Sequence, residues 1–159
     1  MNQETLRPAI RRMLEAHGTA TLATAGPDGP WAAAVFYASD AGLNLYFVTD
    51  PGTRHGGNLR NDARVAGAIH ADVSNWNDVR GLQLEGTARI VPETERPAAL
   101  EIYLRRFPNV RRLAQTPAND EERRIGARLG CIPLWRLAPS RIRIIDNREG
   151  FGWNRELVL

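Results

Sequence analysis

Residues 49–61, Thr-Asp-Pro-Gly-Thr-Arg-His-Gly-Gly-Asn-Leu-Arg-Asn, join two runs of the chain that are typical of β-strands. The run before them is Leu-Asn-Leu-Tyr-Phe-Val at 43–48, and the run after them is Arg-Val-Ala-Gly-Ala-Ile at 64–69. Both are short, rich in apolar and aromatic or β-branched residues, and bounded by turn-forming residues. This arrangement predicts a β-rich fold in which the connection itself has a specific structure.

The connection has the composition of a turn followed by a short helix. Asp50-Pro51-Gly52 supplies turn chemistry, and Thr53 can cap the N-terminus of a helix whose first amides have no intrahelical partner. Such a helix start favours a phosphate, and we expect Arg54 and His55 to reach it. Gly56 and Gly57 are poor helix formers, which indicates the close approach of a ligand or of another backbone segment. The alternative is a simple cap with a solvated arginine and histidine.

Composition limits the classes of protein. The chain has 159 residues and a formal net charge of +3, and we expect one domain spanning 1–159. No apolar run is long enough to cross a membrane and no signal peptide is visible, which predicts a cytoplasmic protein without membrane contact. All 21 basic residues are arginine. The arginine pairs between 105 and 124 alternate with acidic residues, so we predict a solvated helical face and no nucleic-acid partner.

Metal and thiol chemistry find little support. The histidines 17, 55 and 70 are widely spaced, and a single cysteine excludes a zinc spacing, so no metal site is predicted. Cys131 lies beside apolar residues and is expected to be a buried, inert thiol. His70 ends a strand-like run, where a structural hydrogen-bonded histidine and an axial haem ligand are both open.

The remaining periodicity predicts a mainly β protein with peripheral helices. The segment 81–91 alternates strictly, so that Leu82, Leu84, Gly86, Ala88 and Ile90 share one face. The segment 115–130 is polar and is expected to be a mobile excursion with one short helix. The hairpin spacing favours a six- to seven-stranded antiparallel split β-barrel of Greek-key type. The other expected elements are helices over 5–17 and 94–106 and strands over 19–24, 31–38, 132–137 and 141–145.

The order of these elements, with its motifs, resembles the flavin-binding split barrels related to pyridoxamine 5'-phosphate oxidase, and within them a small uncharacterised bacterial subfamily. The resemblance rests on Trp-Ala-Ala-Ala-Val-Phe-Tyr at 31–37, Phe-Val-Thr at 47–49 with Thr-Arg-His at 53–55, Leu-Gln-Leu-Glu-Gly at 82–86, and Asp-Asn-Arg-Glu-Gly-Phe-Gly at 146–152. It covers nearly the whole chain.

The resemblance implies a homodimer that binds flavin mononucleotide (FMN) across its interface and uses it as an oxidoreductase on a small organic substrate. Thr53, Arg54 and His55 match the phosphate grip, and Val48 and Thr49 match the strand end whose backbone faces the flavin ring. Trp153 belongs to a C-terminal segment that either reaches the site of the partner or packs in the interface core. No catalytic residue is assigned. The residues that we expect to bind the cofactor are Phe36, Tyr37, Val48, Thr49, Thr53, Arg54, His55, Asn58, Gln83 and Trp153.

The chain also departs from the oxidase. Ala32 and Tyr37 stand near the positions where the oxidase has arginine and lysine, and His55 replaces a second basic residue. The C-terminal pattern that handles the pyridoxine substrate is absent, so we do not expect vitamin B6 oxidation. A non-enzymatic flavin-binding or flavin-storage protein, or a split barrel that binds haem or the deazaflavin F420, remains the alternative.

Overall fold

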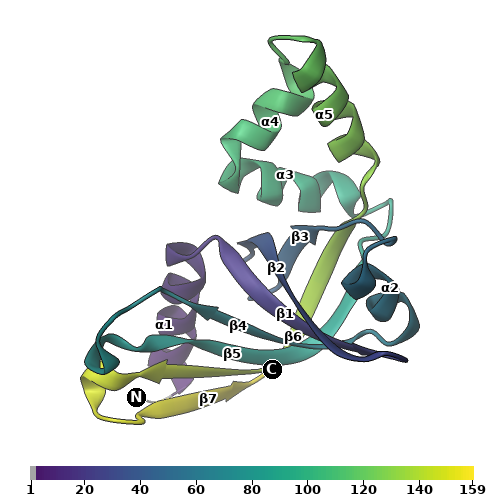
Figure 1. Cartoon of the computed structure of the whole chain (residues 1–159). Helices are drawn as coiled ribbons and strands as arrows, with labels where there is room; N and C mark the ends of the chain where they lie inside the picture. The colour runs from purple at the N-terminus through teal and green to yellow at the C-terminus, as the bar shows by residue number, and fades with distance from the viewer. Residues whose placement is uncertain (1–2) are drawn as a thin grey trace.

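A computed structural model describes residues 3–159 and contains one seven-stranded antiparallel sheet with helices around it (Figure 1). The strands are β1 (Thr19–Gly26), β2 (Gly29–Ser39), β3 (Leu45–Val48), β4 (Arg64–His70), β5 (Arg80–Ile90), β6 (Leu134–Asp146) and β7 (Asn154–Val158). The helices are α1 (Gln3–Ala16), α2 (Arg54–Asn61), α3 (Arg96–Arg106), α4 (Pro108–Gln115) and α5 (Asp120–Cys131), with 3-10 turns η1 (Trp76–Asp78) and η2 (Asn147–Glu149).

The sheet closes on itself. Its strand order is β3-β2-β1-β4-β5-β6-β7, and an additional pairing joins β3 to β6. The first four strands lie in the spatial order β4-β1-β2-β3, which is a Greek key. The predicted fold class, a mainly β split barrel of Greek-key type, is confirmed.

Strand β6 is where the barrel splits, because it changes its pairing partner along its length. Its 13 residues pair with β5 along one edge, while the other edge pairs first with β3 and then with β7. The change of partner falls near Pro139, which has no backbone N–H to donate. Opposite it, the register of β5 shifts between Glu85 and Gly86, and a Cβ on Gly86 would lie 2.2 Å from the Ala138 carbonyl oxygen. Glycine is therefore required where the two strands come closest.

The barrel interior is filled by alternate residues of the strands and by α1. Leu6, Ile10 and Leu14 of α1 enter the main core, as the helical spacing predicts. Leu82, Leu84 and Ala88 of β5 are buried as expected. Ile90 is 44% exposed, so the predicted alternation fails at this end of the strand. The alternation still holds at Ala88, beyond the register shift, so the departure is confined to the last residue of the strand.

Three helices, α3 to α5, form a group beyond one end of the barrel (Figure 1). A second apolar cluster, including Tyr103 and Leu104 of α3, joins this group to the barrel through β3 and β6. The segment 115–130 was expected to hold one short helix in a mobile excursion. One helix is present, α5, which is 12 residues long; it packs against α4, a contact that the sequence did not indicate. A Cβ on Gly126 would lie 2.1 Å from the Leu113 carbonyl oxygen, so the two helices touch through backbone.

Four further differences from the sequence reading are local. The runs 132–137 and 141–145 are one continuous strand, and the C-terminal segment adds β7. Five α-helices are present where two or three were expected. Cys131 is exposed rather than buried, because it is the last residue of α5 and lies outside both apolar clusters. Among the described residues, no helix combines the length and hydropathy needed to span a membrane.

Candidate functional site

The predicted turn and helix start exist as the sequence indicates. Asp50 Oδ1 accepts from the Gly52 N–H at 2.8 Å and closes the turn. Thr53 is the N-cap of α2, with extended backbone angles, and its hydroxyl accepts from the Gly56 N–H at 3.1 Å. The same hydroxyl donates to the Asp50 carbonyl oxygen at 2.7 Å. The Thr53 side chain is therefore fully engaged in building the turn.

Gly56 is explained by another backbone segment. A Cβ at this position would lie 2.4 Å from the Asp50 carbonyl oxygen and 2.9 Å from the Pro51 Cα. Any larger residue would push the helix away from the turn that precedes it. At Gly57 the nearest atom to such a Cβ is 3.8 Å away, so this second glycine is not required by packing.

Two backbone donors remain open at the start of α2. Within residues 3–159, the N–H groups of Arg54 and His55 have no hydrogen-bond partner, whereas Gly56 and Gly57 donate to Thr53. Open amides at a helix N-terminus carry partial positive charge and favour an anion. The helix start therefore has the electrostatics that the sequence predicts.

The His55 imidazole is engaged by hydroxyl groups of the turn. Its Nε2 lies 2.6 Å from the Thr49 hydroxyl and 3.4 Å from the Thr53 hydroxyl. Thr49 is buried, and burial lowers the pKa of the His55 imidazole below its ordinary value. At neutral pH this histidine is therefore neutral, and it joins the end of β3 to the start of α2.

The Arg54 side chain reaches back to the β1–β2 hairpin. Its Nη2 donates to the Asp28 carbonyl oxygen at 2.8 Å, and its guanidinium carbon lies 4.5 Å from the centroid of the Trp31 ring. A guanidinium has five N–H donors, so one hydrogen bond to a carbonyl leaves the others free. The stacking fixes the side chain in place while it remains charged and exposed.

Trp31 and Asp28 were not among the predicted site residues. They lie 23 and 26 positions from Arg54, and nothing in the local sequence pattern pairs them with it. The available signal was an aromatic residue next to the two-residue turn Pro27-Asp28, where side chains are usually exposed.

Asn58, another predicted cofactor-binding residue, is buried against β1. Its amide nitrogen donates to the Thr24 hydroxyl at 3.1 Å, and a Cβ on Gly26 would lie only 2.0 Å from its Oδ1. Asn58 therefore anchors α2 to the barrel in this structure. Thr49 is similarly tied by its carbonyl oxygen, which accepts from the Trp135 Nε1–H at 3.0 Å.

Phe36 and Tyr37 lie on opposite faces of β2. Phe36 is 64% exposed and contacts Phe107 edge to face, with ring centroids 5.6 Å apart. Tyr37 is buried, and its hydroxyl donates to the Leu14 carbonyl oxygen at 2.8 Å. Burial raises the pKa of this phenol, so it stays neutral. Only one of these two predicted residues is available to a ligand on the outer face.

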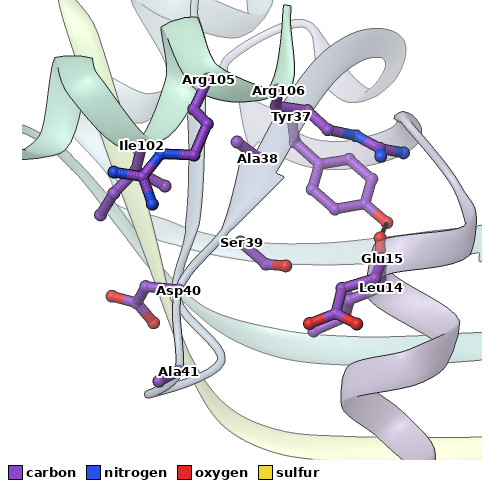
Figure 2. A pocket seen from close by; sticks show the side chains of 10 residues that line it. All are labelled: Leu14, Glu15, Tyr37, Ala38, Ser39, Asp40, Ala41, Ile102, Arg105 and Arg106. Carbon is purple, nitrogen blue, oxygen red and sulfur yellow. Dashed lines mark hydrogen bonds between the residues drawn. The ribbon is translucent and has the colours of Figure 1, made fainter.

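A cavity of about 420 Å³ lies beside Tyr37, between the end of α1, the β2–β3 turn and α3. Figure 2 shows Arg105 and Arg106 on the α3 side, with Glu15 and Asp40 across from them. Both carboxylates are already engaged, Glu15 by Arg11 and Asp40 by the Asn44 and Tyr46 side chains. This cavity does not include the α2 turn.

The other predicted residues are dispersed in the single chain. Val48 is half-buried against the second apolar cluster, and Gln83 is exposed on the outer face of β5. Trp153 packs partly buried against the main core, with the Arg155 guanidinium 5.1 Å from its ring centroid. The structure thus groups Thr49, Thr53 and His55 in one hydrogen-bonded cluster and leaves Gln83 and Trp153 apart from it.

Comparison with known proteins assigns the chain to a family. A family model described as pyridoxamine 5'-phosphate oxidase matches residues 6–143. The chain belongs to the pyridoxamine 5'-phosphate oxidase family. Within this family it groups with the UPF0306 proteins. One from Klebsiella pneumoniae (strain 342) is 30% identical over 158 residues, which cover 96% of this chain and 95% of that protein.

Solved structures agree on the fold of this pyridoxamine 5'-phosphate oxidase family member. A heme binding protein from Mycobacterium smegmatis matches with a TM-score of 0.70 at 22% identity, over 96% of this chain and 57% of that one. Campylobacter jejuni ChuZ matches with a TM-score of 0.73 at 15% identity, over 99% of this chain and 61% of that one. The chain spans less than two thirds of either protein, and at these identities the likeness shows the fold alone.

The structure shows where the two residues that differ from the oxidase pattern, Ala32 and Tyr37, lie. Ala32 is exposed on the outer face of β2, where an arginine would have room to project. Tyr37 faces the core, as described above, and contributes a hydrogen bond to α1 rather than a charge. Neither residue supplies a cationic group, so Arg54 and the helix N-terminus are the positive groups that the predicted phosphate position keeps from the pattern.

Proposed function

We propose that this protein binds FMN and acts as an FMN-dependent oxidoreductase on a small organic substrate. The observation that carries the proposal is the start of α2, which combines two unpaired backbone N–H groups with the exposed side chain of Arg54. The family membership supports the same reading.

The donor set fits a phosphate monoester. The Arg54 and His55 amides supply two N–H donors, and Arg54 retains guanidinium donors beyond the one used by Asp28. The Asp50 carboxylate accepts from the Gly52 N–H and so closes the turn. The Thr53 hydroxyl is engaged in capping the helix and is not one of these donors. The role of Thr53 is to hold the two free amides in position.

Bound FMN would supply the hydride or electron transfer, and the chain would supply position and electrostatics. Arg54, fixed by Trp31 and Asp28, would orient the phosphate end. The neutral His55 would keep β3 and α2 in register through Thr49. Phe36 presents an exposed ring on the outer face of β2, where a flat ligand could pack against it.

We also propose that the functional unit is a homodimer. The outer face of the sheet carries small exposed side chains, among them Ala23, Ala32, Ala34 and Ala66. A hollow of about 680 Å³ lies on this face over β1, β4, β5 and β6. Small side chains let two sheets approach closely, and the resemblance to flavin-binding split barrels implies a flavin at such an interface.

The test is a titration of FMN followed by quenching of its fluorescence. Arg54→Ala removes a charge-assisted hydrogen bond worth about 1.5–3 kcal/mol, so the dissociation constant should rise by about tenfold or more. Arg60→Ala is the matched control, because Arg60 is an exposed arginine in the last turn of the same helix. Equal affinity in the two variants would refute the phosphate position.

Reduction of the bound FMN by nicotinamide donors distinguishes an enzyme from a flavin-storage protein. If FMN binds and nicotinamide donors reduce it, the oxidoreductase reading holds. If FMN binds and no donor reduces it, the protein is a flavin-binding or flavin-storage protein instead. The deazaflavin F420 is tested by the same titration.

Haem binding is a second candidate. His70 is exposed at the end of β4, and its Nδ1 lies 3.1 Å from the Ala71 carbonyl oxygen, which leaves Nε2 without a partner among the described residues. A metal-ligating histidine commonly donates its other ring N–H to a carbonyl in this way. A Soret band that appears with hemin and disappears in His70→Ala would support this candidate over FMN.

A further inference from the structure

A second cavity, of about 400 Å³, lies between α1 and the strand ends where β6 leads into η2. Figure 1 shows α1 and α2 on different sides of the barrel, so this cavity is separate from the α2 turn. Its volume is within the range of sites for small ligands. We refer to it as the α1 cavity.

The lining of the α1 cavity combines apolar and cationic groups. The apolar part includes Ala9, Met13 and Ile144 together with the Trp153 indole. The indole is fixed by its contact with the main core and by the Arg155 guanidinium over its ring. The flat apolar part of a ligand could therefore pack against an indole that is already held in position.

The charged lining is positive overall. Arg148 pairs with Asp146 through two hydrogen bonds, so these two charges compensate each other. Arg12 and Arg80 also line the cavity, and within residues 3–159 neither makes an ion pair. Glu149 is the one remaining carboxylate. The pKa of the Asp146 carboxyl is lowered mainly by Arg148 and also by Arg80, so this carboxylate acts on both guanidinium groups. Three guanidinium groups against two carboxylates leave the lining positive and favour an anionic ligand.

His17 provides an independent observation at the same cavity. It lines the cavity, and its Nε2 is buried with no hydrogen-bond partner among the described residues. Burial, Arg80 and His70, in that order, lower the pKa of this imidazole, which is therefore neutral at pH 7. A buried polar nitrogen left unpaired costs about 1–3 kcal/mol, so this imidazole would gain from a hydrogen-bond partner.

We propose that the α1 cavity binds a small aromatic carboxylate. Arg12 and Arg80 pair with the carboxylate group, and the His17 ring rotates so that its Nε2–H donates to one of the carboxylate oxygens. The aromatic body packs against Trp153 and Met13. The proposal does not depend on FMN binding, because no group of the α2 turn takes part.

The test uses benzoate as the probe and the imidazole nitrogens as the reporter. The chain has three histidines, so a side-chain ¹H–¹⁵N spectrum resolves His17 from His55 and His70. Benzoate should shift the His17 resonances in a saturable manner and leave those of His55 unchanged. Benzyl alcohol, which lacks the charge, and inorganic phosphate, which lacks the ring, should each bind more weakly.

Substitutions test the assignment of the charged groups. Arg12→Ala with Arg80→Ala should weaken benzoate binding by about tenfold or more, since each charge-assisted contact is worth about 1.5–3 kcal/mol. Arg7→Ala, an exposed arginine on the same helix, should leave it unchanged. Arg12→Ala alone serves if the double variant does not fold.

Three results would overturn the proposal. The first is the absence of any His17 shift with benzoate. The second is unchanged benzoate affinity in a folded Arg12 variant and in the folded double variant. The third is binding of benzyl alcohol or phosphate as tight as that of benzoate, which would remove either the charge or the ring from the recognition.

Discussion

The Arg54 guanidinium lies 4.5 Å from the centroid of the Trp31 ring and is held there by a hydrogen bond to the Asp28 carbonyl oxygen. This contact joins the start of α2 to the tip of the β1–β2 hairpin. It keeps a flexible, charged side chain in one position at the surface.

Trp31→Leu should therefore weaken FMN binding without removing any phosphate donor. A cation–π contact at an exposed site is worth about 0.5–1 kcal/mol, so the dissociation constant should rise by roughly two- to fivefold. Trp76→Leu is the matched control, since Trp76 is another exposed tryptophan whose ring contacts Phe151. If both variants bind FMN with the affinity of the unaltered chain, Trp31 does not position Arg54 for the ligand.

Asn58 and Gly26 should behave as a coupled pair. Gly26→Ala would place a Cβ 2.0 Å from the Asn58 Oδ1 and is expected to lower the free energy of unfolding by about 1–3 kcal/mol. Asn58→Ala removes the partner of the Thr24 hydroxyl at a similar cost. In the double variant the clash is gone, so the two effects should not add.

Urea unfolding of the two single variants and the double variant measures this coupling. Gly57→Ala is the control, because a Cβ there meets nothing closer than 3.8 Å and should raise the stability of the helix by roughly 0.5–1 kcal/mol. Strictly additive losses for Gly26 and Asn58 would show that the two side chains do not share this space.

How far the sequence predicts this molecule depends on the range of the contact. The Thr53 cap, the α2 start and the buried alternation of Leu82 and Leu84 follow from patterns within a few residues, and they are found. The Arg54–Trp31 contact and the Thr24–Asn58 hydrogen bond join residues 23 and 34 positions apart, and local patterns contain no signal for them. The inward engagement of His55 depends on Thr49 at the end of another element.

The helical group shows the same limit. The charge-rich sequence 115–130, which contains most of α5, suggested an excursion, because it lacks the apolar content of a core element. The order of α4 and α5 comes from backbone contact at Gly126 and from ion pairs such as Arg112 with Glu122, 10 positions apart. Exposed ion pairs of this kind are individually weak, so charged residues in the sequence do not by themselves predict that two helices pack together.

Gly126→Ala should unfold this group locally. The added Cβ would lie 2.1 Å from the Leu113 carbonyl oxygen, so α4 and α5 would have to separate. Gly130→Ala, on the same helix, meets nothing within 4 Å and is the control. Hydrogen exchange should increase in α4 and α5 of the Gly126 variant and remain unchanged in β4 and β5. Unchanged exchange in α4 and α5 would show that the contact is not needed.

Stability should fall as the pH is lowered from about 8 to about 5. Burial is the main cause of the lowered pKa values of His17 and His55, so both stay neutral in the folded protein at a pH where the unfolded chain has begun to protonate. The unfolded state then binds more protons, and the free energy of unfolding rises with pH through the ordinary histidine range near 6.5.

Urea unfolding as a function of pH measures this dependence. A His55→Gln variant should show a smaller slope between these pH values, because one of the two depressed imidazoles is gone. A slope of the opposite sign would mean that the folded protein holds the imidazoles charged.

The central claim is that the start of α2 holds the phosphate of FMN. The most direct measurement is the visible absorption spectrum of the purified protein, taken after incubation with FMN and removal of the excess. The account predicts a two-band flavin spectrum that stays with the protein and is lost in Arg54→Ala but not in Arg60→Ala. A colourless protein that retains no FMN would contradict it.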